Sequence, residues 1–131
     1  MKSIRAFRGA TQLAADSSQE MRESVGELLA EIFEKNDLAN EDLISMLFTA
    51  TPDLTCEFPA VGARLFGITD VPLICASEID VAGALPRTVR VLIHAESRRN
   101  RSEVVHIYLG GAASLRPDLI LGSNGEAKGL K

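Results

Sequence analysis

The chain has 131 residues and a formal net charge of −4 at pH 7, with 46% hydrophobic and 24% charged residues. This length fits one domain, and the acidic balance argues against a general nucleic-acid binder, whose domain is usually basic. Two cysteines, Cys56 and Cys75, are too few for a disulfide framework or a structural zinc site. The longest apolar run, Val71 to Ala76, is too short to cross a membrane. We therefore expect a cytoplasmic protein with no nucleic-acid and no membrane partner.

The first third of the chain predicts a strand, a long helix and a second strand. A strand is expected from about Ser3 to Arg8, and a buried strand from Leu43 to Thr51. Between them, a helix is expected from Ser18 to about Lys35, because apolar residues recur there at helical spacing. These residues are Met21, Val25, Leu28, Leu29, Ile32 and Phe33. Ser17, followed three residues later by Glu20, predicts a reciprocal capping box at the start of the helix.

The segments after Pro52 predict a short helix and three more strands. Proline suits the first turn of a helix, so Phe58-Pro59-Ala60 predicts a helix start, with Gly67 as its terminator. Val71 to Ala76 predicts a buried strand, and a loop follows from Ser77 to Arg87.

Two further strands are expected near the end of the chain. From Thr88 to Ala95 the sequence alternates, with Val89, Val91, Ile93 and Ala95 on one face. Val104 to Leu109 predicts a last strand, which Gly110-Gly111 ends. The order of elements predicts one α/β domain: a mixed sheet with its helices on one face.

Few of the usual catalytic motifs occur in the sequence. No glycine pattern fits a dinucleotide or phosphate-binding loop, and no serine lies in a nucleophile elbow. His94 and His106 lie on predicted strands with no further ligand at metal spacing, so neither a metal nor another cofactor is expected. Cys75 has no identifiable base and is interpreted as an inert buried thiol.

Arginines in or beside apolar segments remain as candidate functional residues, together with Glu78 after a buried strand. These arginines are Arg8, Arg64, Arg90 and Arg116. Each one alone is most often a surface side chain whose stem lies along the fold. The residues by themselves therefore predict no more than a domain able to bind a small anionic ligand.

Six segments in order give the sequence a specific resemblance. They are Arg8-Gly9-Ala10-Thr11, Thr49-Ala50-Thr51-Pro52-Asp53-Leu54, Phe58-Pro59-Ala60, Glu78-Ile79-Asp80-Val81, Tyr108-Leu109 and Leu115-Arg116-Pro117-Asp118-Leu119. From about Ile4 to Leu119 the sequence resembles the monofunctional AroH class of bacterial chorismate mutases. The resemblance implies a chorismate mutase domain over residues 1–119. The turn-rich run from Gly122 to Glu126 predicts a flexible tail over residues 120–131.

The resemblance also implies an activity and an assembly. The expected enzyme is an isomerase that rearranges chorismate to prephenate in phenylalanine and tyrosine biosynthesis, without a cofactor. The expected assembly is a homotrimer that forms a pseudo-α/β barrel, with active sites in clefts between neighbouring subunits.

The site residues are carried over by motif position. Arg90, Glu78 and Arg8 are the expected catalytic residues, and with Tyr108 and Cys75 they would come from one subunit. Phe58, Ala60 and Arg64 would come from the adjacent subunit. The remaining expected substrate contacts are Leu73, Ile74, Leu115 and Arg116, the last two in a segment that covers the cleft. The sequence departs from the family pattern at Val61 and Ile74, where relatives often carry lysine and a polar residue.

Three other readings remain open at this point. The main alternative is a non-catalytic trimer of similar fold that binds a small anion without turnover. A trimeric enamine or imine hydrolase of comparable shape and a purely structural protein are the other two. The joint presence of Arg8, Glu78 and Arg90 favours the mutase.

Overall fold

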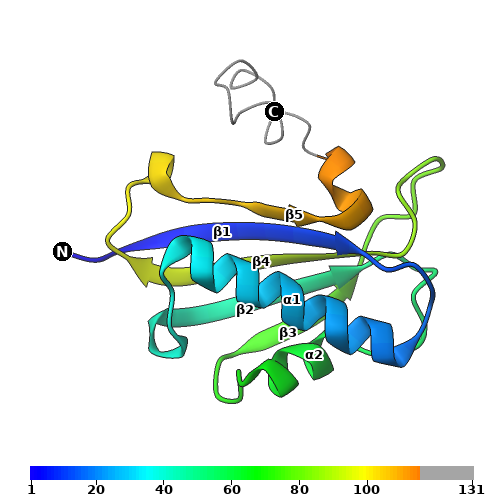
Figure 1. Ribbon diagram of the computed structural model, residues 1–131, viewed down its shortest axis with the longest axis horizontal. Coiled ribbons are helices and arrows are strands. Elements are labelled where there is room, and N and C mark those ends of the chain that lie inside the picture. The colour runs from blue at the N-terminus through cyan, green and yellow to red at the C-terminus, as the bar shows by residue number, and fades with distance from the viewer. Residues whose placement is uncertain (116–131) are drawn as a thin grey trace.

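A mixed five-stranded sheet forms the centre of the computed structural model, which describes residues 1–115 (Figure 1). The strands are β1 (Ser3–Gln12), β2 (Leu43–Ala50), β3 (Leu73–Ser77), β4 (Thr88–Ser97) and β5 (Ile107–Leu109), in the spatial order β3-β2-β4-β1-β5. β4 runs antiparallel to both β1 and β2, whereas β5 runs parallel to β1 and β3 runs parallel to β2. The predicted fold class is confirmed, and the predicted tail, 120–131, lies outside the described residues.

Helix α1 (Ser18–Asn36) covers one face of the sheet, as its apolar stripe predicts (Figure 1). Its buried residues include Met21, Val25 and Leu28, which pack against the sheet in one hydrophobic core. The predicted capping box is only half formed. Ser17 Oγ accepts the Glu20 N–H, but the Glu20 carboxylate accepts the N–H of Ala14 and does not return to Ser17.

Two glycines let elements approach each other closely around α1. A Cβ atom on Gly9 of β1 would lie 2.7 Å from Ile32 Cδ1 and 3.1 Å from the Ile107 carbonyl oxygen. A Cβ atom on Gly62, in helix α2 (Pro59–Phe66), would lie 2.7 Å from Val25 Cβ. Protein interiors are too closely packed to accommodate such overlaps, so both positions require glycine, which has no side chain. The two helices therefore pack directly against each other on the same side of the sheet.

β1 is longer than the sequence predicted, because it is paired on both sides. Its ladder with β4 runs from Ser3–Ser97 to Gln12–Thr88, and β5 pairs with Gly9 to Thr11 from the other side. The expected end at Arg8 rested on glycine and alanine, which are weak strand formers by themselves. Pairing with two neighbours overrides this local preference.

β5 is shorter than predicted, because the residues before it bind a helix side chain. Asn36, only 1% exposed at the end of α1, donates from Nδ2 to the Val105 carbonyl and accepts the Val105 N–H at Oδ1, both at 2.8 Å. The backbone of Val105 thus takes a side-chain amide as its partner in place of a strand. The expected strand from Val104 consequently begins only at Ile107.

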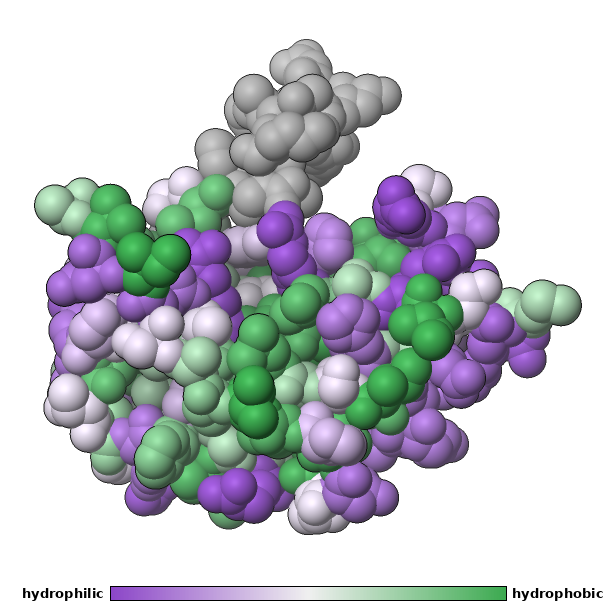
Figure 2. Space-filling model, turned by 180° about the vertical axis from the view of Figure 1, so that it is seen from behind, coloured by the Kyte–Doolittle hydropathy of each residue, from purple (hydrophilic) through white to green (hydrophobic). Residues whose placement is uncertain are grey.

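The face of the sheet without helices is largely apolar in its middle part (Figure 2). Strand alternation turns Ala6, Leu47, Leu92 and Ile74 toward this face, opposite to the buried Phe7, Phe48 and Val91. Ile74 keeps 67% of its surface exposed in the single chain. Within residues 1–115, no helix is long and apolar enough to span a bilayer.

We expect Asn36→Leu to lower the free energy of unfolding by about 1–3 kcal/mol, because both backbone groups of Val105 would lose their partner. Urea unfolding at fixed protein concentration measures this loss. Glu27→Ala, on the exposed face of the same helix, is the control. An Asn36→Leu protein no less stable than this control would contradict the assignment.

Candidate active site

One row of residues across four strands organises the candidate site. Thr49 on β2 pairs with Arg90 on β4, Arg90 pairs with Ala10 on β1, and Ala10 pairs with Tyr108 on β5. Paired residues point to the same side of a sheet, so the row lies on the helix-free face. The small side chain of Ala10 separates Arg90 from Tyr108, and Arg8 lies two residues before it on the same side.

These side chains surround one cavity of about 200 Å³. Arg8, Glu78, Arg90 and Tyr108 line it, together with Thr49 and a few apolar residues. The structure therefore brings together four of the five residues that the sequence assigned to one subunit. Two of them are arginines, so the cavity presents guanidinium groups to a ligand.

Glu78 links two of the strands at this cavity. Its Oε2 atom lies 3.3 Å from Arg90 Nε and accepts a hydrogen bond from Thr49 Oγ1. The Glu78 N–H donates to the Ala50 carbonyl at 2.9 Å, which extends the β2–β3 pairing by one residue. This bond fixes the backbone of Glu78, from which the carboxylate reaches the cavity. Arg90 is thereby oriented by an acceptor at Nε, while its two Nη groups make no hydrogen bond to any of residues 1–115.

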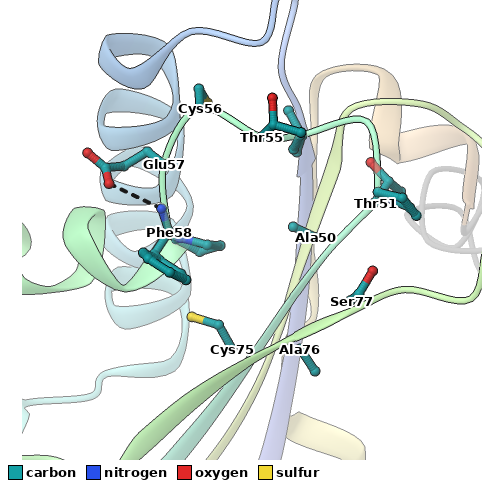
Figure 3. A pocket seen from close by; sticks show the side chains of 12 residues that line it. Ala50, Thr51, Thr55, Cys56, Glu57, Phe58, Cys75, Ala76 and Ser77 are labelled. Atoms are coloured by element: carbon teal, nitrogen blue, oxygen red, sulfur yellow. Dashed lines mark hydrogen bonds between the residues drawn. The ribbon is translucent and has the colours of Figure 1, made fainter.

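Cys75 lies away from this cluster within the single chain. It pairs with Phe48, which is buried beneath the helices, so its side chain is on the helix-covered face. There it lines a larger cavity of about 550 Å³ together with Phe58 and residues 50–52 and 54–57. Figure 3 shows the Cys75 sulfur pointing toward Phe58. The structure thus groups Cys75 with Phe58 and separates it from Arg90.

The other predicted contact residues occupy several parts of the fold. Ala60 is buried at the start of α2, and Arg64 is exposed on the same helix. Leu73 packs against the core, whereas Ile74 is on the helix-free face. Leu115 ends a 3₁₀ turn, Gly110–Leu115, that packs against β1. Arg116 lies outside the described residues.

The carboxylate of Asp16 makes three hydrogen bonds to the segment that leads to Phe58. Asp16 Oδ1 accepts the N–H groups of Thr55 and Cys56, and Asp16 Oδ2 accepts the Thr55 hydroxyl at 2.7 Å. Hydrogen bonds from Cys56 and Thr55 favour the ionised form and lower the pKa of Asp16 from 3.8 to about 2. Asp16 therefore ties the 51–58 segment to the loop before α1.

One thiol near the site is held in its protonated form, and the described part of the chain contains no metal-binding cluster. Burial, reinforced by the neighbouring Asp16, raises the pKa of Cys56 to about 11, so this thiol stays protonated. Residues 1–115 hold no group of three or more histidine, cysteine or acidic side chains placed to bind a metal ion.

The chain matches known proteins over most of its length. The family model for chorismate mutase type I matches residues 4–119. The chain belongs to the chorismate mutase type I family. This confirms the resemblance found in the sequence.

Individual relatives agree with the family assignment. The chain is 40% identical over 124 residues to chorismate mutase AroH of Bacillus subtilis (strain 168), covering 94% of this chain and 98% of that protein. It is 40% identical over 117 residues to chorismate mutase AroH of Thermus thermophilus, covering 88% and 96%. A solved structure, chorismate mutase from Clostridium thermocellum Cth-682, superposes with a TM-score of 0.82 at 40% identity, covering 84% of this chain and 98% of that one.

Sequence reasoning missed two residues at or beside this candidate site. Thr49 binds the Glu78 carboxylate, and Asp16 holds the segment that leads to Phe58. Thr49 was placed in a buried strand and in one of the six resemblance segments but was given no role in the site, and the alternation of that strand was the available signal for its orientation. Asp16 gave no signal, because its partners lie about forty residues away in the sequence.

We expect Asp16→Asn to lower the free energy of unfolding at pH 7. A pKa that is lower in the folded state contributes stability above the unfolded value of 3.8, and this contribution disappears as the pH falls toward about 2. The difference between Asp16→Asn and the wild type should therefore shrink over this acid range. Denaturant unfolding at several pH values measures it.

Asp70→Asn is the matched control for this experiment. Asp70 is an exposed carboxylate with no hydrogen-bond partner among residues 1–115. A difference between Asp16→Asn and the wild type that stays constant from pH 7 to the acid range would refute the role of the ionised carboxylate.

Proposed function

We propose that this protein is a chorismate mutase, an isomerase that rearranges chorismate to prephenate on the route to phenylalanine and tyrosine. The observation that carries the proposal is the convergence of Arg8, Arg90 and Glu78 on one cavity in a chain of this family. The reaction breaks one carbon–oxygen bond and forms one carbon–carbon bond within a single molecule. It requires no nucleophile, metal or redox cofactor.

Restraint of the substrate is the first task of such a site. The enolpyruvyl arm of chorismate must fold over the ring before the new bond can form, and holding that geometry removes an entropic part of the barrier. Chorismate is a dianion, and a guanidinium group offers a carboxylate two parallel hydrogen bonds. In the proposal, Arg8 and Tyr108 bind the enolpyruvyl carboxylate.

Charge stabilisation in the transition state is the second task. Negative charge grows on the ether oxygen as its bond lengthens, and a donor fixed there favours the transition state over the substrate. Arg90 is the proposed donor: Glu78 accepts at Nε, which leaves the two Nη groups for the substrate. Glu78 would also contact the ring hydroxyl and stabilise partial positive charge on the ring.

The proposed active enzyme is a cytoplasmic homotrimer with a shared cleft between neighbours. One subunit would supply Arg8, Glu78, Arg90 and Tyr108, and the next would supply a second group of residues. That group is Phe58, Ala60, Arg64, Leu73, Ile74 and Cys75. The apolar helix-free face and the exposed Phe58 and Ile74 support such an assembly. Leu115 and Arg116 would cover the cleft.

Purified protein should consume chorismate, with loss of its absorbance, in the absence of any added cofactor. Arg90→Ala should lower turnover by at least about 10²–10³-fold, because one fixed donor to the developing charge is lost. Arg90→Lys should be nearly as impaired, since a point charge cannot hold Glu78 and the ether oxygen together. A coupled prephenate assay measures both.

Arg98→Lys, the same change at an exposed arginine, is the matched control. Near-full activity of Arg90→Lys would show that the proposed role of Arg90 is wrong. Protein that binds chorismate without converting it would refute the mutase and favour a non-catalytic anion-binding protein.

Mixing two inactive variants tests whether the cleft is shared. Arg90→Ala and Arg64→Ala, unfolded and refolded together, should recover activity, because some mixed clefts contain both arginines. Random assembly of an equimolar mixture into rings would restore about a quarter of the clefts. A mixture no more active than the two separate variants would place both arginines in one subunit's site or outside it.

A further inference from the structure

A histidine side chain connects β1 to the residues that precede β5. His106 Nδ1 accepts the backbone N–H of Arg8 at 3.0 Å. The regular pairing of β1 with β5 begins one residue later, at Gly9 and Ile107. Nδ1 of the ring therefore replaces the backbone carbonyl that would accept this N–H in a regular ladder. The contact between β1 and β5 is thereby extended to Arg8.

The direction of this bond fixes the protonation state of the ring. Because the Arg8 N–H is the donor, Nδ1 carries no proton, and the neutral ring has its proton on Nε2. A ring protonated at Nδ1 would present one donor to another, and the bond would be lost.

The ring shares a cavity with several basic side chains. Arg5 and Arg8 from β1, His94 from β4 and Arg101 line the same cavity as His106, and no acidic side chain of residues 1–115 lines it.

The bond joins two strands that each carry a candidate site residue. Arg8 lines the 200 Å³ cavity from β1, and Tyr108, two residues after His106, lines it from β5. The residue before the histidine, Val105, is already fixed to Asn36 of α1. The approach to β5 is thus held at two consecutive residues, one bound to the helix and one to the backbone of Arg8.

We propose that His106 is a positioning residue for the active site, which sets the backbone of Arg8 against β5 and so aims the Arg8 guanidinium at the substrate carboxylate. The proposal rests on the proposed function for the role of Arg8. It assigns no contact between His106 and substrate. Its effect is on binding, because Arg8 holds a carboxylate that is charged in both the substrate and the transition state.

Three variants test the proposal by their KM and kcat for chorismate. His106→Leu removes the acceptor and should raise KM about tenfold while kcat changes less than about threefold. His106→Asn places an amide oxygen where Nδ1 was and should restore KM to within about threefold of the wild type. His94→Leu makes the same change in the same cavity without touching the Arg8 N–H, and it should leave both constants unchanged.

The outcomes separate a positioning role from general damage to the fold. Rescue by asparagine and not by leucine supports the proposal, because both variants lose the ring. Wild-type KM in His106→Leu, or equal impairment of the asparagine and leucine variants, would overturn it.

A second measurement does not depend on activity. Long-range ¹H–¹⁵N NMR of the wild-type imidazole should show an unprotonated Nδ1 on His106, and amide exchange at Arg8 should be faster in His106→Leu than in His106→Asn. A proton on Nδ1 would overturn the proposal. Wild-type protein that fails to convert chorismate would refute the proposed function, while these two readouts would still decide the hydrogen bond.

Discussion

The pairing of β1 between an antiparallel and a parallel neighbour is the constraint on which the candidate active site depends. Ala10 pairs with Arg90 on one side and with Tyr108 on the other, and Arg8 follows the same face of β1. Neighbouring strands lie about 5 Å apart, so these side chains meet without any loop having to place them. A slip of one residue in either pairing would turn Arg90 or Tyr108 to the helix-covered face. The close approach of α1 at Gly9 and the bond from His106 to Arg8 both act on this register.

The charged side chains of the site favour binding of an anionic ligand more than they stabilise the fold. Arg8 and Arg90 line one small cavity and repel each other, and Glu78 offsets only part of this charge. The ion pair between Arg90 and Glu78 is partly exposed, and exposed pairs contribute little to folding. Its physical effect is orientation, since it engages Nε and leaves the outer nitrogens of the guanidinium available. A dianionic substrate would supply the negative charge that residues 1–115 leave unmatched at this cavity.

The sequence predicted those features that depend on local patterns. The stripe of α1, the proline at the start of α2 and the alternation of β4 all predicted elements that the structure contains. Features set by distant residues were missed: β5 begins late because Asn36, 69 residues before Val105, takes the backbone partners of that residue. In the site, the motifs predicted that Arg8, Glu78, Arg90 and Tyr108 belong together. They did not predict that Cys75 lies on the opposite face, since that follows from its pairing with Phe48.

The separation of the two residue groups within one chain bears on how copies would assemble. Arg8, Glu78, Arg90 and Tyr108 lie on the helix-free face, whereas Phe58 and Cys75 line a cavity on the helix-covered side, near the edge strand β3. Phe58 keeps 68% of its surface exposed, which is unusual for so large an apolar side chain in a finished assembly. A cleft built from both groups needs two different surfaces to meet. Such a contact is heterologous, and repeated contacts of this kind form a ring where the rotation closes, not a two-fold dimer. The proposed trimer is the kind of assembly that this asymmetry favours.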